Sequence, residues 1–167
     1  MRIACFLLSL VVFASPASAQ TSSREDFKEF CKLVEGRWIC TDTKLPADWI
    51  GSDGEKVTSY GVNEIAVDGH ALKSVWFGAS RTSEWMTVFD SSSGEIRILF
   101  VASDGTVAQA VMAKKDGKWT RRATVSHPDG TKEEVIATLV SVSDDGTIHT
   151  WKDSRFEEPQ VWQRVDK

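Results

Sequence analysis

Two arginines with the potential to bind an anion fall on one face of a predicted sheet. If Asp116-Gly117 forms a two-residue hairpin turn, Met112 lies opposite Arg121, and residues directly opposite each other share a face. The same arithmetic across Asp104-Gly105 places Arg97 opposite Met112. A buried arginine is costly unless an anion accompanies it. The pattern therefore predicts that Arg97 and Arg121 hold the acidic group of a small ligand inside the protein, with Met112 against its apolar body.

The same row of residues has two other interpretations. Turns at Asp129-Gly130 and Asp145-Gly146 extend the row to Thr138 and Asp153, so Arg121 could form an internal ion pair with Asp153 in a filled interior. Alternatively, a bulge shifts the register, and a slip of one residue would move the whole row to the outer face. The sequence leaves these alternatives open.

The predicted register also turns a hydrophobic set of side chains outward. The set is Trp85, Phe89, Ile96, Ile98 and Phe100. An apolar patch of this size is more than a monomer usually exposes, so either the amphipathic helix or a partner chain covers it, or the register slips near the Ser91-Ser92-Ser93 turn. The alternative function is therefore a protein–protein interaction or structural module with a filled interior that uses this outer aromatic face, for example as a homodimer.

Two tryptophans are further candidates for ligand contacts. Trp76 lies opposite Gly61 across the Asp68-Gly69 turn and is predicted to face inward, against the core or the body of a ligand. Trp49 lies in the long connection over residues 42–56, where it would either line the entrance or anchor the loop.

The sequence contains no recognisable catalytic constellation. The histidines, His70, His127 and His149, are isolated from any nucleophile, and no Gly-x-Ser-x-Gly elbow or metal-ligand spacing occurs. We therefore expect a protein that is not an enzyme and that holds no metal.

The first nineteen residues have the pattern of a secretory signal peptide. Met1-Arg2 precedes an apolar run over residues 3–14, and Ala17-Ser18-Ala19 fits a cleavage site. We expect export to the periplasm or the medium, with residues 20–167 forming a single domain without a membrane span. The net charge of −4 and the lack of a basic cluster argue against nucleic acid as a partner. In an exported chain, Cys31 and Cys40 predict one disulfide.

The predicted elements are one helix followed by strands. Ser23 and Asp26 form a near capping box, and Gly36 is placed to end the helix. Its apolar face would consist of Phe27, Phe30, Cys31 and Val34. After Trp38, Asp-Gly pairs occur six times between short stretches rich in β-branched and aromatic residues. About ten hairpin-linked strands would leave exposed edges unless they close, which predicts an all-β, up-and-down antiparallel β-barrel opened by a short N-terminal helix.

An ordered set of motifs adds a family resemblance. The stretches "LVEGRW", "IAVDGHAL", "FDSSSGEI", "DGKW" and "HPDGTKEE" span nearly the whole mature chain. In this order they resemble the calycin superfamily of lipocalins and fatty-acid-binding proteins, and most closely an exported bacterial lipocalin-like family of unknown function. The resemblance implies that Arg164 packs over Trp38 at the closed end of the barrel. It also brings haem bound through His149 into consideration, since some ten-stranded calycin barrels bind haem; a single histidine favours this weakly, and we expect no cofactor.

Overall fold

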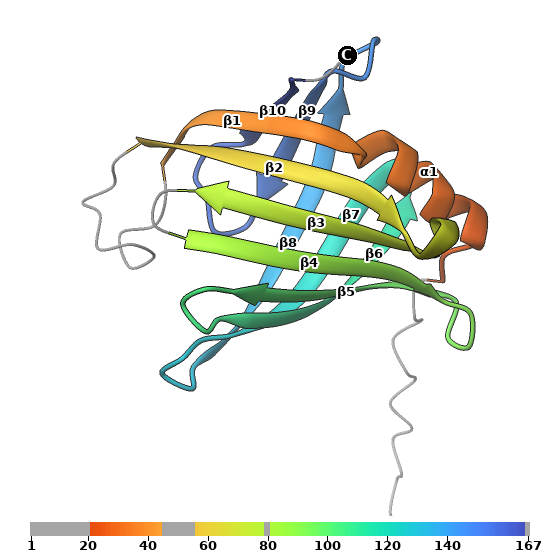
Figure 1. Ribbon diagram of the computed structural model, residues 1–167, viewed down its shortest axis with the longest axis horizontal. Helices are drawn as coiled ribbons and strands as arrows, with labels where there is room; N and C mark the ends of the chain where they lie inside the picture. The colour runs from red at the N-terminus through yellow and green to blue at the C-terminus, as the bar shows by residue number, and fades with distance from the viewer. Residues whose placement is uncertain (1–20, 45–55, 79–80, 166–167) are drawn as a thin grey trace, which may run out of the picture.

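The described part of the chain folds into one helix and a closed barrel of ten antiparallel strands (Figure 1). The computed structural model describes residues 21–44, 56–78 and 81–165. The elements are α1 (Arg24–Val34), β1 (Gly36–Lys44), β2 (Lys56–Ala66), the short 3-10 turn η2 (Val67–Gly69), β3 (Ala71–Gly78), β4 (Arg81–Asp90), β5 (Glu95–Ala102), β6 (Val107–Lys115), β7 (Lys118–Ser126), β8 (Lys132–Val142), β9 (Ile148–Asp153) and β10 (Gln160–Arg164). Each strand pairs with its neighbour in sequence, and β10 returns to β1. The predicted fold class is confirmed.

Helix α1 lies across one end of the barrel (Figure 1). It starts at a complete capping box, in which the Ser23 hydroxyl accepts a hydrogen bond from the Asp26 amide and the Asp26 carboxylate accepts one from the Ser23 amide. The apolar face of the helix, formed by Phe27, Phe30, Cys31 and Val34, is buried in the same core cluster as the inward side chains of the strands. Burial of this face, more than helix propensity, holds α1 in place.

The carbonyl groups at the end of α1 are satisfied by the barrel. The Trp38 indole donates to the Val34 carbonyl at 2.8 Å, and the buried Asn63 amide donates to the same oxygen at 2.6 Å. The Arg164 guanidinium donates to the carbonyls of Leu33 and Glu35 and lies 4.5 Å from the centre of the Trp38 ring. A cation is favourable at a helix C-terminus, so these contacts close this end of the barrel.

The predicted register holds across one hairpin and fails across the next. Met112 lies opposite Arg121 across Asp116-Gly117, as predicted. Across Asp104-Gly105, however, Met112 lies opposite Ile96, and Arg97 lies opposite Val111. The Ala102 amide bonds to the Thr106 carbonyl, so this turn is a three-residue loop, one residue longer than the predicted hairpin. The predicted inward position of Arg97 is therefore wrong. Its half-exposed side chain instead forms ion pairs with Asp90 and Glu95 on the outer surface.

Two further register errors cancel each other. The His127 amide bonds to the Thr131 carbonyl, so the Asp129-Gly130 turn also has three residues, and Arg121 lies opposite Ala137, not Thr138. A bulge in β8 between Leu139 and Ser141 then shifts β9 by one residue and places Asp153 opposite Ala137. Arg121 and Asp153 consequently remain in one inward row.

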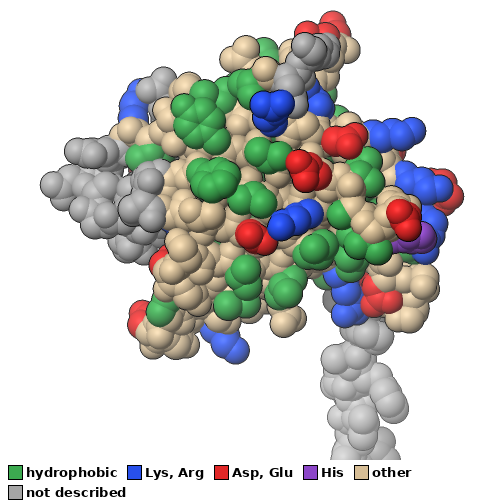
Figure 2. Space-filling model, in the orientation of Figure 1, with side chains coloured by type: hydrophobic (Ala, Val, Ile, Leu, Met, Phe, Trp, Pro, Cys, Tyr) green, Lys and Arg blue, Asp and Glu red, His purple; other side chains and the backbone are tan. Residues whose placement is uncertain are grey.

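The predicted outer aromatic face does not exist, because the shift at β5 turns these residues inward. Ile96 and Ile98 are buried, and Trp85, Phe89 and Phe100 pack against the core. The outer side over β1 to β5 instead shows separate hydrophobic groups among acidic and basic side chains (Figure 2). The interaction module predicted from that face therefore loses the surface it depended on.

The predicted Cys31–Cys40 disulfide is absent, and both thiols are buried. Cys31 belongs to the core cluster beneath α1, and burial raises its pKa to about 11. Strand β1 carries Cys40 two residues beyond Trp38, and it is Trp38 that bonds to the end of α1, whereas Cys40 Sγ lies 4.0 Å from the Thr41 carbonyl.

Two predictions fall on residues that the structure does not describe. The signal peptide over residues 1–19 and the entrance residue Trp49 both lie outside the described ranges. Among the residues that are described, no helix is long and apolar enough to cross a membrane.

Candidate functional site

The interior of the barrel contains a partly open cavity of about 270 Å³. Alanines on the inner face of β6, β7 and β8 leave this space, which larger side chains would fill. These alanines are Ala108, Ala110, Ala123 and Ala137, all nearly inaccessible to solvent. Met112 lies on the same wall. Small side chains opposite a wall of aromatic ones leave room for a ligand that a uniformly large core would exclude.

Aromatic side chains form much of the remaining lining. Trp76 meets Trp162 edge to face, with ring centres 4.6 Å apart, and Trp85 meets Phe100 in the same way at 4.9 Å. All four line the cavity. Such rings offer a large apolar surface with little conformational freedom to lose on binding.

Glycine at position 61 makes room for the Trp76 ring. Gly61 lies opposite Trp76 on the inner face, and a Cβ atom at this position would lie 2.1 Å from the indole. Gly61→Ala is therefore expected to push Trp76 off its place and to cost about 1–3 kcal/mol of unfolding free energy, measured by urea denaturation. As a control, the same change in a Trp76→Ala background should cost much less. An equal loss in both backgrounds would show that the clash with the ring is not the cause.

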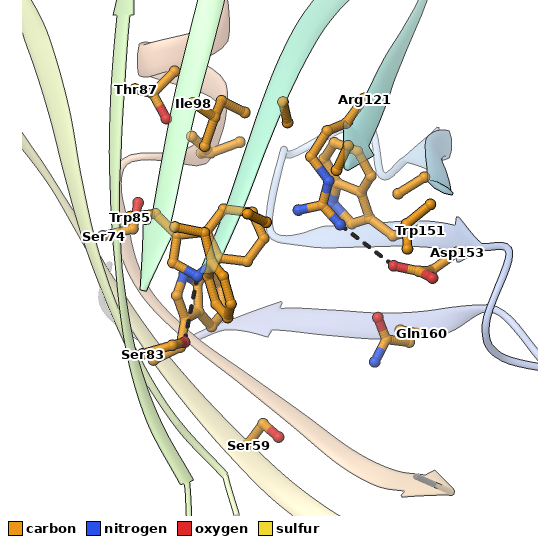
Figure 3. A pocket seen from close by; sticks show the side chains of 18 of the residues that line it. Ser59, Ser74, Ser83, Trp85, Thr87, Ile98, Arg121, Trp151, Asp153 and Gln160 are labelled. Atoms are coloured by element: carbon orange, nitrogen blue, oxygen red, sulfur yellow. Dashed lines mark hydrogen bonds and ion pairs between the residues drawn. The ribbon is translucent and has the colours of Figure 1, made fainter. Parts of the chain in front are cut away.

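The charged centre of the cavity is Arg121 (Figure 3). Its guanidinium lies 4.5 Å from the centre of the Trp85 ring, and Nη2 donates to Asp153 Oδ2 at 3.3 Å. Its Nε is buried without a hydrogen-bond partner. Burial lowers the pKa of Arg121 to about 10, so the group is still charged at neutral pH. A positioned, buried guanidinium with an unused donor is a ready anion site.

Asp153 is held mainly by Arg155 and only weakly by Arg121. Arg155 donates to Oδ1 through Nε at 2.9 Å and through its backbone amide at 3.0 Å, and to Oδ2 through Nη2 at 2.8 Å. Burial alone would raise the pKa of Asp153, but the hydrogen bonds and charge of Arg155, together with the charge of Arg121, hold it below its ordinary value. The carboxylate is therefore ionised and almost fully used as an acceptor.

The cavity lining carries more positive than negative charge. The charged side chains among its described residues are Arg81, Arg121, Arg155 and Asp153. Arg81 is balanced by Asp104 outside the lining, at 3.3 Å. Asp153 therefore faces both Arg121 and Arg155. Because Arg121 shares this carboxylate and keeps an unused Nε donor, it can still bind an anion from the cavity.

A second polar group of the cavity is His149, near the helix end of the barrel. The ring is 2% exposed and stacks on Trp38 with ring centres 4.2 Å apart. Its Nε2 has no hydrogen-bond partner. Burial, aided by the charge of Arg164, lowers the pKa of His149 to about 4, so the imidazole is neutral at neutral pH.

Most of the predicted site residues line the cavity. Arg121, Met112, Trp76 and Asp153 are brought together, whereas Arg97 lies outside the barrel. Sequence reasoning missed Arg155 and Arg81. Arg155 follows Asp153 in "KDSRF", where an aspartate that accepts from the backbone amide two residues on could have been recognised as a turn motif.

The chain was compared with known protein families and with curated proteins. No family model and no curated protein matches it. The closed ten-strand antiparallel barrel is compatible with the calycin-like fold that the motifs implied.

Proposed function

We propose that the barrel binds, without catalysing a reaction, a small and largely apolar ligand that carries one acidic group. The observation that carries this proposal is Arg121, which lies buried in a largely apolar cavity with an unused Nε donor. A carboxylate or phosphate would fill the planar fork of the guanidinium. The signal sequence predicted over residues 1–19 would place this binding in the periplasm or outside the cell.

The rest of the cavity suits an apolar body of limited size. Its volume of about 270 Å³ lies just below the usual range of small-molecule pockets, which suits a medium-chain acid better than a long lipid. The alanine wall, Met112 and Trp76 would contact this body. Because the Arg121 guanidinium already packs on the Trp85 ring, its side chain loses little conformational entropy when the ligand binds.

The electrostatics of the site favour binding over catalysis. The carboxylate of Asp153 has its oxygens occupied by arginines and its pKa lowered, so it is a poor general base. His149 has its pKa lowered to about 4 and is a weak base as well. Neither group has the pKa near neutrality that proton transfer would require.

Arg121→Met is expected to weaken binding of decanoate by roughly 10- to 100-fold, because it removes a charge-assisted hydrogen bond to the acid. Asp153 keeps its contacts with Arg155 in this variant, so the barrel should remain folded. Isothermal titration calorimetry with decanoate and with the uncharged decanol measures the effect. The wild type should prefer decanoate, and the variant should lose that preference.

Arg97→Met is the matched control, since it removes an arginine from the outer surface of β5, two strands away from Arg121 on β7. It should leave both affinities unchanged. If the wild type bound decanoate no better than decanol, or if the two variants behaved alike, the acidic-group site at Arg121 would be rejected.

A further inference from the structure

His149 presents a buried polar atom that the fold leaves without a partner. The residue is 2% exposed and lines the cavity, and its Nε2 makes no hydrogen bond. Buried polar atoms in folded proteins are nearly always satisfied, because leaving one unpaired costs the free energy of its lost hydration. Because His149 lines the cavity, a ligand in the cavity is the available source of a partner for this atom.

His149 is well separated from the charged centre at Arg121 and Asp153. His149 and Asp153 are both inward residues of β9, four positions apart, which corresponds to about 13 Å along a strand. Asp153 ends β9 at the side away from the helix, whereas His149 stacks on Trp38, which bonds to the end of α1. Trp151 lies between them on the same face and also lines the cavity. A ligand anchored at Arg121 could therefore reach His149 only with its far end.

The surroundings of His149 select the kind of group that could bind there. The ring is neutral at neutral pH, and it stacks on Trp38 and lies opposite Trp162. A second carboxylate would have to leave water, and Arg164, the cation whose charge acts on His149, already donates to the carbonyls of Leu33 and Glu35. A hydroxyl group can either donate to Nε2 or accept from it, so it fits both tautomers of a neutral imidazole. A purely apolar end would leave Nε2 unsatisfied.

We infer that the ligand carries a hydroxyl group at the end opposite its acidic group, and that His149 Nε2 hydrogen-bonds this hydroxyl. This inference rests on the proposed function, because it assumes that Arg121 holds the acidic end. It narrows the ligand class to hydroxy acids whose two polar groups are separated by an apolar chain.

The test compares two series of probes by calorimetry: straight-chain acids from hexanoate to dodecanoate, and the same acids with a terminal hydroxyl. At the chain length that spans the cavity, the hydroxyl should tighten binding by roughly tenfold, the effect of one hydrogen bond to a buried partner. His149→Phe should abolish this preference and leave binding of the plain acids within about twofold of the wild type. His127→Phe is the matched control, because His127 pairs with Glu133 outside the cavity lining.

Nitrogen NMR of wild-type protein labelled in histidine gives a readout that needs no variant. The Nε2 resonance of His149 should shift when the fitting hydroxy acid binds and should shift much less with the plain acid. If plain acids bind but no hydroxy acid binds more tightly or moves this resonance, the role of His149 is overturned and the proposed function stands. If neither series binds, both are overturned.

Discussion

Asp153→Asn is expected to lower the free energy of unfolding by about 3–5 kcal/mol at neutral pH, the largest electrostatic effect we predict for this chain. The substitution keeps the size of the side chain and removes its charge. Arg121 and Arg155 would then face each other across the cavity lining without the anion between them. The amide nitrogen of asparagine would also turn a donor toward a guanidinium that has only donors to offer. Urea denaturation followed by circular dichroism measures the loss.

Asp104→Asn is the matched control. Asp104 also pairs with an arginine of the cavity lining, Arg81, but its side chain is 42% exposed, so solvent screens the pair and the loss should stay below about 1 kcal/mol. Decanoate should recover part of the loss in Asp153→Asn, because an anion bound at Arg121 replaces the missing charge. Equal losses in the two variants would mean that Asp153→Asn does not leave Arg121 as an uncompensated buried charge.

The pH dependence of the stability of the wild type and of Asp153→Asn gives an independent check that Asp153 is ionised in the folded protein. The pKa of Asp153 is lowered in the folded protein, so its contribution is present above the ordinary value of 3.8 and is lost as the pH falls through the folded-state pKa. The wild type should therefore lose its advantage over Asp153→Asn in acid. An advantage that persisted well below that range would contradict the ionised state of Asp153.

The elements could be predicted because their signals are local. Ser23 and Asp26 start the helix within one turn of chain, and Gly36, with a φ of 111°, follows its end directly. The Asp-Gly pairs that lie within the described residues mark turns between strands, and a series of hairpins leaves exposed edges unless it closes. Local chemistry thus sufficed for the number and order of the strands.

The register could not be predicted, because one dipeptide serves two kinds of turn. Asp116 has a φ of 51° and belongs to a two-residue turn, in which both central residues are left-handed. Gly105 also has a positive φ, of 88°, but Asp104 before it does not, and that loop has three residues. Which form a given Asp-Gly adopts depends on the packing of the strands on either side. That packing decided the side of the barrel on which Arg97 lies.

The hydrophobic pattern of β5 predicts the correct inward face, whereas the register counted from the turns predicts the opposite one. Ile96, Ile98 and Phe100 alternate along β5 and would have been buried by any assignment that weighed apolar residues first. For the cavity itself, the inward alanines of β6, β7 and β8 are only a partial signal. Its volume depends on the rotamers of Trp76, Trp85 and their neighbours, which no sequence pattern determines.

Trp38→Ala is expected to cost about 3–5 kcal/mol of unfolding free energy, the typical range for truncating a large buried aromatic residue. The indole is 2% exposed and lies against the His149 ring and the Arg164 guanidinium, at 4.2 Å and 4.5 Å respectively. It also bonds to the Val34 carbonyl at the end of α1. Its removal would therefore open a void where helix, first strand and last strand meet.

Two substitutions separate the packing of Trp38 from its hydrogen bond. Trp38→Phe keeps most of the ring and loses only the indole N–H, and Asn63 still donates to the Val34 carbonyl, so its loss should be about 1 kcal/mol. Tyr60→Ala removes an aromatic ring that is 53% exposed and should cost less still. Hydrogen exchange of the α1 amides should speed up in Trp38→Ala alone, because this end of the helix is held by the indole. If exchange in α1 stayed slow while global stability fell, the indole would be a core residue of the barrel that does not hold the helix.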